Sequence, residues 1–357
     1  MYFGVGPKEH KKDLYGFDRE YSELCEAISS QNRLIIVKGL RRTGKTSLLN
    51  AVYANLPPGK LFIDAREISG KGSSEVYSHI ISRLSAYMQS RNILRNIAGA
   101  ISSVELGVKV SVQRQTPLLS AMLSEIDTQA GRAKKTFCIF IDEAQMLKQS
   151  GFDAFLAFAY DRFKNTKTVL AGSEIGLLDE FAGESSRSPL YGRVKKTIAT
   201  RKFERMESLD FLRRGFSQAG KKPAEAQIEA AVDGLDGTAG WLSMYGFYAL
   251  SESHASALAK TRQEGTKIVR EEINAFMEQR RVAERQYLTI LSALATEPLA
   301  WGKIRNYLEI RLGKAVPDSR LFAYLSALES YGLIEKRDGR YFVSDPLIKE
   351  AVSGPGR

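Results

Sequence analysis

Short apolar segments alternate with helix-length amphipathic segments through the first part of the chain. Five of the apolar segments have the length of strands: Leu34–Lys38, Leu61–Asp64, Thr136–Asp142, Thr168–Gly172 and Thr197–Phe203. The first three are nearly continuous in Ile, Leu, Val and Phe, which is typical of strands buried on both faces. Strands that alternate with helices favour a parallel sheet covered on both sides. The sequence therefore predicts an α/β core over residues 1–206.

Two later changes of pattern divide the chain further. Ser103–Gln113 alternates apolar and polar side chains around Gly107, which predicts an inserted hairpin or edge ribbon. From about Glu207 the spacing of apolar residues is helical throughout, so we expect a separate all-helical unit over residues 207–280.

The charged run EQRRVAER, near residues 276–284, marks a join to a third unit over residues 281–357. Helical spacing there predicts three helices, and two short strands follow around the turn pair Asp338 and Gly339. The predicted helices are Tyr287–Ala295, Trp301–Leu312 and Ser319–Tyr331. Three helices followed by a hairpin favour a winged helix-turn-helix domain.

The first predicted strand leads into VKGLRRTGKTSLLN, residues 37–50, which contains a phosphate-binding pattern. Two glycines five residues apart let the backbone N–H groups fold around phosphates, Lys45 supplies positive charge and Thr46 supplies a metal ligand. Arg41 and Arg42 lie at the tip of the loop, where they could meet the nucleotide, a neighbouring domain or nucleic acid. We expect the loop to bind a nucleotide through Gly39, Leu40, Arg41, Arg42, Thr43, Gly44, Lys45, Thr46 and Ser47.

Two acids, Asp142 and Glu143, follow the apolar run FCIFI and so emerge at the carboxyl end of a predicted buried strand. Ligands bind at that edge of an open α/β sheet. A magnesium–nucleotide site needs a loop hydroxyl and a carboxylate on the metal, and hydrolysis needs a group that orients water. We expect Thr46 and Asp142 to hold Mg2+ and Glu143 to act on water, although solvated acids at a strand end would give the same pattern.

Composition limits which ligands, metal or disulfide sites and cellular locations remain plausible. The net charge is +11, and residues 1–206 hold most of the excess, with 31 Lys and Arg against 21 Asp and Glu. This favours a polyanionic ligand and is compatible with nucleic acid or with a basic surface kept for solubility. Only Cys25 and Cys138 occur, and the three histidines have no ligand spacing, which argues against a disulfide framework or a zinc site. No apolar stretch has the length of a membrane span, so we expect a cytoplasmic protein.

A family resemblance adds to this interpretation. LYGFDREYSEL, GLRRTGKTSLL, FIDEAQ, VLAGSEIGLL, SPLYGR and a terminal YFVSDPLIKEAV stand in the order found in archaeal-type ATPases of the AAA+/STAND group of P-loop NTPases. The chain resembles these proteins over nearly its whole length. The resemblance implies a P-loop NTPase core with an AAA+-like parallel sheet, a helical lid and a C-terminal winged helix. It also implies ATP and Mg2+ as ligands, with Asp142 on the metal and Glu143 as the hydrolytic residue.

The resemblance implies roles for three further residues. Ser173 matches a polar sensor between the acids and the γ-phosphate, or it caps the helix that starts near Ile175. Arg193, in SPLYGR, matches an arginine finger that acts in cis or on a neighbouring subunit, or it is a surface arginine. Phe17 lies where the entry segment approaches adenine, and it either stacks on the base or packs in the core.

Two positions depart from the family pattern. Many relatives have a Gly-x-Pro turn in the lid, whereas this chain has Ala239 before Gly240, and no lid arginine can be assigned as a second sensor. Signalling members often end the fourth strand with an arginine, where this chain has Ser173 and Glu174.

Three functions compete on these residues. The first is an ATP-driven molecular switch whose nucleotide state controls contact with double-stranded DNA or a regulatory protein through the winged helix, as a monomer or an oligomer. The second is a nucleotide-stabilised DNA-binding protein in which hydrolysis is incidental. The third predicted helix of the winged helix is poor in cations, with Arg320 against Asp318 and Glu329, whereas the second helix and the wing are richer. A kinase or small-molecule transferase is the third, and Glu143 beside the metal-binding acid argues against it.

Overall fold

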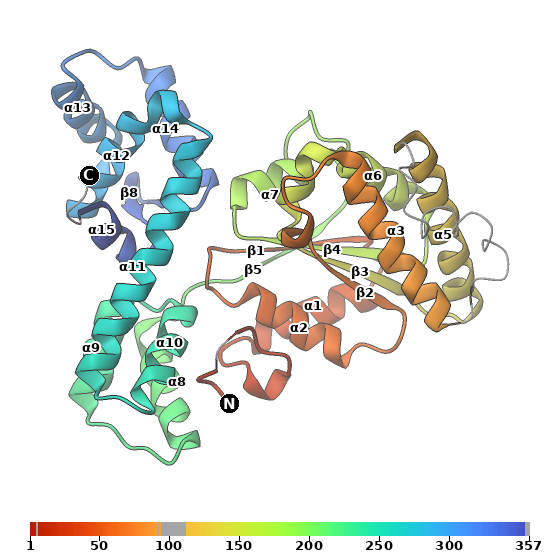
Figure 1. Ribbon diagram of the computed structural model, residues 1–357, viewed down its shortest axis with the longest axis horizontal. Helices are drawn as coiled ribbons and strands as arrows, with labels where there is room; N and C mark the ends of the chain where they lie inside the picture. The colour runs from red at the N-terminus through yellow and green to blue at the C-terminus, as the bar shows by residue number, and fades with distance from the viewer. Residues whose placement is uncertain (5, 92, 94–111, 354–357) are drawn as a thin grey trace.

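A five-stranded parallel sheet forms the centre of the core, with strand order β2-β3-β4-β1-β5 (Figure 1). The computed structural model describes residues 1–4, 6–91, 93 and 112–353. The strands are β1 (Leu34–Lys38), β2 (Lys60–Asp64), β3 (Phe137–Asp142), β4 (Thr166–Gly172) and β5 (Lys196–Ala199). All five strands predicted from the apolar pattern are therefore present, and the last is shorter than expected.

Helices cover both faces of this sheet (Figure 1). On one side lie α1 (Asp18–Ser29) and α2 (Lys45–Asn55), and on the other α3 (Ser73–Ser90), α5 (Val112–Arg132), α6 (Phe152–Arg162) and α7 (Ile175–Phe181). Side chains alternate along β1, since Ile35 and Val37 join one buried cluster while Leu34 and Ile36 join the other.

The predicted ribbon over residues 103–113 falls mainly outside the described residues. Residues 112 and 113 belong to α5, so the ribbon cannot extend as far as predicted. Short 3-10 helices complete the core at η1 (Lys11–Asp13), η2 (Ala65–Ile68) and η4 (Ala144–Ser150).

A helical lid follows the core. It consists of α8 (Arg205–Gln218), α9 (Glu225–Leu235), α10 (Ala239–Ala249) and α11 (His254–Glu278). The amino-terminal segment is anchored here, because Phe3 is buried and its ring lies against the backbone of Gly215 and Gly246. The 25-residue α11 runs from the lid to the C-terminal domain, so it links the two (Figure 1).

The C-terminal domain is a winged helix. It contains η5 (Arg281–Ala283), α12 (Glu284–Thr296), β6 (Leu299–Ala300), α13 (Trp301–Leu312), α14 (Asp318–Ser330), β7 (Ile334–Arg337), β8 (Arg340–Val343) and α15 (Pro346–Ser353). The hairpin turn has Asp338 and Gly339 at φ 47° and 74°, the left-handed conformation that a two-residue turn requires. The predicted fold class is confirmed, while the divisions at residues 206 and 280 stay predictions.

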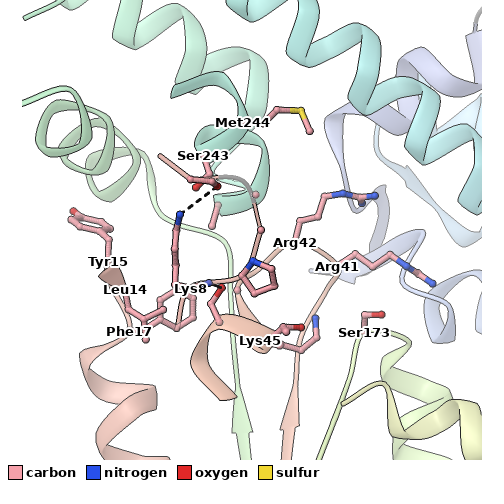
Figure 2. A pocket seen from close by; sticks show the side chains of 18 of the residues that line it. Lys8, Leu14, Tyr15, Phe17, Arg41, Arg42, Lys45, Ser173, Ser243 and Met244 are labelled. Carbon is pink, nitrogen blue, oxygen red and sulfur yellow. Dashed lines mark hydrogen bonds between the residues drawn. The ribbon is translucent and has the colours of Figure 1, made fainter. Parts of the chain in front are cut away.

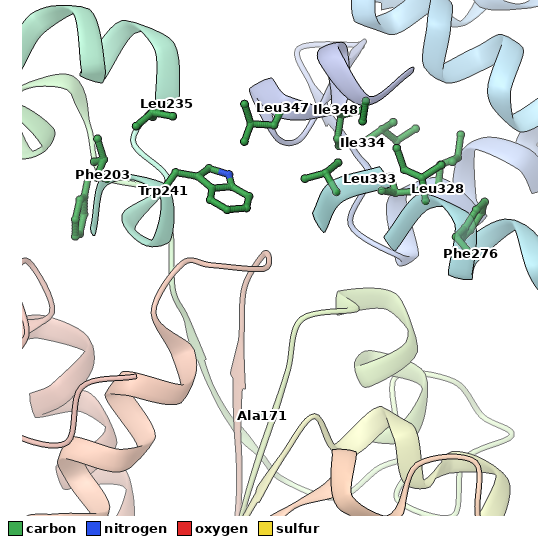
Figure 3. Close-up of a cluster of buried hydrophobic side chains, with 14 of the residues drawn as sticks. Ala171, Phe203, Leu235, Trp241, Phe276, Leu328, Leu333, Ile334, Leu347 and Ile348 are labelled. Carbon is green, nitrogen blue, oxygen red and sulfur yellow. The ribbon is translucent and has the colours of Figure 1, made fainter. Parts of the chain in front are cut away.

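Buried apolar side chains continue from the lid into the winged helix (Figure 3). Trp241 of α10 is 1% exposed, and its indole Nε1 donates a hydrogen bond of 2.8 Å to Asp345 before α15. The same cluster includes Phe276, Leu328, Leu333, Ile334, Leu347 and Ile348. The lid and the winged helix therefore share one apolar core. Within the described part of the chain, no helix is long and apolar enough to cross a membrane.

Candidate functional site

The glycine-rich loop lies between β1 and α2, at the carboxyl edge of the sheet. Gly44 has φ 90°, and a Cβ there would lie 2.4 Å from the ring of Phe17. A Cβ on Gly39 would lie 2.2 Å from the hydroxyl of Thr200. Thr43 fixes the loop, since its hydroxyl donates to the carbonyl of Leu40 over 2.7 Å. Only glycine fits both positions, which leaves the backbone free to approach a ligand closely.

The loop lysine, Lys45, is 4% exposed, and its ammonium donates to the carbonyl of Leu40 over 2.6 Å. Burial lowers the pKa of Lys45 to about 8, although the charges of Glu143 and Asp142 oppose that shift. The neighbouring hydroxyl of Ser47 accepts a hydrogen bond of 3.0 Å from the backbone N–H of Lys8. The amino-terminal segment therefore lies directly against the phosphate loop.

The two acids at the end of β3 have different partners. The hydroxyl of Thr46 donates to Asp142 over 2.7 Å, so the two residues expected to share a metal are in contact. Asp142 is fully buried, and this burial raises the pKa of its carboxyl group. These oxygen ligands are the type that Mg2+ prefers. Among the described residues no group of three or more His, Cys, Asp or Glu could hold a metal, so other oxygens would have to complete the coordination.

Glu143 stands at φ 50° and is held by three hydrogen bonds to one carboxylate oxygen. The donors to Oε2 are the hydroxyl of Ser173 at 2.9 Å, its backbone N–H at 3.1 Å, and the amide of Gln145 at 2.7 Å. The N-cap residue of α7 is Glu174, and that helix has no side-chain cap. Ser173 therefore contacts Glu143 and does not cap α7, while its role as a sensor of the γ-phosphate stays a prediction.

A cavity of about 580 Å³ opens in front of these groups (Figure 2). The loop, Glu143 and Ser173 line its polar part. Its other walls are formed by the amino-terminal segment, by aromatic residues of the core, and by α8 and α10 of the lid. These wall residues include Lys8, Leu14, Tyr15, Phe17, Phe203, Phe211, Ser243, Met244 and Phe247. A polar end and an aromatic end suit a molecule with phosphates and a flat apolar ring.

Phe17 packs in the core, as one of its two interpretations predicted, and its stacking on a base stays a prediction. It is 7% exposed and packs on Gly44, and it also lines the cavity.

The tip arginines of the loop point away from α2, toward the lid and the winged helix (Figure 2). Arg41 donates to the carbonyl of Tyr331 and to the carboxylate of Glu174, each over 2.8 Å, and its guanidinium lies 4.5 Å from the Tyr331 ring centre. Burial raises the pKa of Glu174, and Arg41 opposes that shift. Arg41 therefore bonds the last turn of the winged-helix segment α14 to the core.

Arg42 bonds the loop to the lid. Its guanidinium donates to both carboxylate oxygens of Glu272 on α11, over 2.6 and 3.2 Å, and lies 4.2 Å from the Trp241 ring centre. The backbone N–H of Gly240 donates to the carbonyl of Arg42 over 3.0 Å. The departure from the lid pattern at Ala239 therefore coincides with a direct backbone contact between lid and loop. Of the alternatives open for the arginines, neighbouring domains are the contact observed.

Arg193 lies elsewhere. Its guanidinium pairs with Asp161 at the end of α6, with Nε 3.0 Å from a carboxylate oxygen, and it does not line the cavity. The structure thus brings Phe17, Lys45, Thr46, Asp142, Glu143 and Ser173 together and leaves Arg193 apart.

Sequence reasoning missed Glu272, Tyr331, Trp241, Gln145 and Lys8. The first three come from segments far along the chain, and no local pattern marks them. Gln145 stands two residues after Glu143 in FIDEAQ, so its position gave the one available signal.

Comparison with known proteins agrees with this geometry. Residues 17–245 match the family described as an ATPase domain predominantly from Archaea, and residues 281–343 match the C-terminal winged helix-turn-helix domain of MCM proteins. A search of curated protein sequences finds no match.

Two solved structures cover almost the whole chain. A Walker-type ATPase of Pyrococcus abyssi is 28% identical over 99% of both chains, with a TM-score of 0.81. The ORC2 protein of Aeropyrum pernix, solved in ADPNP–ADP complexes, is 15% identical over 98% of this chain and 95% of that one, with a TM-score of 0.59. The second likeness concerns the fold alone. The chain therefore belongs to the ATPase family found predominantly in Archaea, as a nucleotide-binding ATPase with a C-terminal winged helix.

Proposed function

We propose that this ATPase is a molecular switch in which the state of the phosphate loop sets how the lid and the winged helix are held against the core. The observation that carries the proposal is the double attachment of the loop tip, through Arg41 to Tyr331 and through Arg42 to Glu272. The loop would surround phosphates on one side, and it holds two other domains on the other. Nucleotide binding and domain attachment are therefore physically coupled.

The catalytic part of the proposal assigns a role to each polar group of the cavity. Thr46 and Asp142 would hold Mg2+, which supplies charge neutralisation on phosphate oxygens when it is bound. Lys45 adds a further positive charge there, and Glu143 orients and activates water. Ser173 positions the Glu143 carboxylate, whose contact distance of 2.9 Å supports that role. ATP would place its base among the aromatic residues near Phe17.

The coupling follows from electrostatics. Glu272 lines the same cavity as the loop, so a polyphosphate would bring negative charge toward the carboxylate that holds Arg41 and Arg42. Phosphates and Glu272 then compete for the same two guanidinium groups. Binding ATP would loosen the attachment, and loss of the γ-phosphate would restore it.

Arg193 would take part in this proposal only as an arginine finger on a neighbouring subunit. Within one chain it is paired with Asp161, so a finger role on a neighbouring subunit would require that pair to open. The divisions at residues 206 and 280 separate the three proposed moving parts.

The test combines ATP turnover with a distance measurement. Dyes on Lys164→Cys and Glu297→Cys, in a Cys25→Ser background, report the separation of core and winged helix by energy transfer. Both labelled positions are exposed. We expect ATP to change the separation and hydrolysis to reverse it, Glu143→Gln to stay in the ATP-bound state, and Lys45→Ala not to respond.

Two outcomes would overturn parts of the proposal. Turnover at the wild-type rate in Glu143→Gln would remove the hydrolytic assignment. A separation that is the same with and without ATP, in an enzyme that turns over, would remove the switch and favour a nucleotide-stabilised DNA-binding protein.

A further inference from the structure

A groove lined by arginines runs between α12 and α13, on the winged helix. Its volume is about 720 Å³, and its lining residues are Arg281, Glu284, Arg285, Leu288, Thr289, Ser292, Tyr307 and Arg311. Three cations thus face one acid. None of these three arginines forms an ion pair with any described residue, whereas most arginines of the lid do.

Helical spacing places one more basic residue, Lys303, beside the groove. Along α13, Lys303, Tyr307 and Arg311 are four residues apart and therefore share one face of the helix. Lys303 and Arg311 are exposed. Among the described residues, the guanidinium of Arg285 alone of the three donates a hydrogen bond, to the carbonyl of Arg311 over 3.2 Å. It joins the two helices and leaves the positive charges without a carboxylate partner.

In a winged helix the helix that usually contacts DNA bases corresponds here to α14, which carries little positive charge. Of its charged residues, Arg320 stands against Asp318 and Glu329, and Asp318 is paired with Arg305 over 3.0 Å. Its last residue, Ser330, packs against the core, because a Cβ on Gly176 of α7 would lie 2.3 Å from its hydroxyl. This helix therefore has little positive charge to offer DNA phosphates, and its end is covered.

We propose that the α12–α13 groove, defined by Arg281, Arg285, Tyr307 and Arg311, binds the phosphate backbone of double-stranded DNA. Unpaired guanidinium groups match a polyphosphate in charge and geometry. Single-stranded nucleic acid is the weaker match, since it needs open aromatic faces for base stacking. The one aromatic ring of the groove, Tyr307, has the guanidinium of Arg311 5.6 Å from its centre. The inference deepens the proposed function by naming the DNA partner of the switch.

Fluorescence anisotropy of a labelled duplex of about 30 base pairs with the full-length protein tests the groove. The triple variant Arg281→Gln/Arg285→Gln/Arg311→Gln removes three charges from it. The matched control, Lys336→Gln/Arg337→Gln/Arg340→Gln, removes three charges from the wing. We expect the groove variant to lose about tenfold or more in affinity, and its slope of log K against log salt to shrink by about 2 to 3. The wing variant should stay within about twofold of wild type.

The single variant Arg281→Glu tests the groove without disturbing the packing of the domain, because Arg281 is exposed and lies outside the α12–α13 contact. It should also weaken duplex binding. Equal losses in both triple variants, or a loss in the wing variant alone, would overturn the proposal. Groove-dependent binding that is tighter for single strands, duplex RNA or a polyglutamate peptide would also overturn it.

This failure is distinguishable from failure of the switch. Normal turnover and a normal ATP-dependent separation without groove-dependent DNA binding refute the groove alone. Groove-dependent DNA binding in a protein whose separation ignores ATP refutes the switch alone.

Discussion

The carboxylate of Glu272 is the shared partner of both tip arginines, so its replacement should loosen the attachment of the loop. Glu272→Gln keeps the size of the side chain and removes the charge. The side chains involved, Arg41, Arg42 and Glu272, are 21%, 17% and 24% exposed, between a surface pair and a buried one. Surface pairs contribute up to about 1 kcal/mol, whereas breaking buried ones costs about 3 to 5 kcal/mol.

The expected effect of Glu272→Gln lies between the energies of a surface ion pair and a buried one. One amide oxygen can still accept from Arg42, so we expect the variant to weaken the attachment by about 1 to 3 kcal/mol. If phosphates compete with Glu272, that loss appears as tighter nucleotide binding. A change of about 1.4 kcal/mol corresponds to a tenfold change in Kd. We therefore expect Glu272→Gln to bind ATP about tenfold more tightly.

Calorimetric titration with a non-hydrolysable ATP analogue measures this change, and circular dichroism checks the fold. Glu271→Gln is the matched control, because Glu271 is the exposed neighbour on α11 and carries the same charge. An unchanged or weaker affinity in a folded Glu272→Gln protein would refute the competition between phosphates and Glu272. Equal tightening in Glu271→Gln would assign the effect to net charge instead.

Four further predictions concern the cavity and the lid. Ser173→Ala removes one bond to the Glu143 carboxylate and should lower kcat about tenfold with little change in ATP affinity; steady-state kinetics that leave kcat unchanged would contradict this. Because burial lowers the pKa of Lys45 to about 8, the free enzyme loses this charge above that pH, so calorimetry should find weaker ATP binding toward about pH 9. Lys45→Ala should lack that dependence. The same shift makes the ligand-free fold more stable as pH rises from about 8 toward 10.5, where only the unfolded chain still binds the proton. Phe3→Ala should lower the free energy of unfolding by about 3 to 5 kcal/mol, and an unchanged thermal midpoint would refute the anchoring of the amino terminus.

Local sequence was sufficient wherever neighbouring residues determine the structure. The strand β1 and the loop that follows it were predictable because apolar continuity and two obligatory glycines lie within a few residues of each other. Asp142 and Glu143 could be placed for a similar reason, since Asp142 ends a fully buried strand and Glu143 follows it. The winged helix followed from helical spacing and from the turn at Asp338.

The partners of Arg41 and Arg42 could not be predicted in this way. Glu272 lies 230 residues from Arg42, and Tyr331 lies 290 residues from Arg41. Three other glutamates, Glu264, Glu271 and Glu278, stand on α11, and the local sequence does not single out Glu272 among them. Only packing of the lid on the loop distinguishes them. Ser173 was ambiguous for a related reason, because a serine before a helix is a common cap and its contact with Glu143 depends on the register of β3 and β4.

Different residues of the phosphate loop serve the nucleotide and the neighbouring domains. In the proposed function Gly39, Gly44, Lys45 and Thr46 act on a phosphate, which leaves positions between them for other contacts. In this chain two of those positions are arginines that hold the lid and the winged helix. Coupling between sites in proteins is typically about 1 to 3 kcal/mol, the same range as that expected for the partly exposed Arg–Glu272 contacts. A fully buried pair would hold the domains too firmly for a nucleotide to release them, and an isolated surface pair would transmit too little. The intermediate burial of these arginines is therefore what a reversible attachment requires.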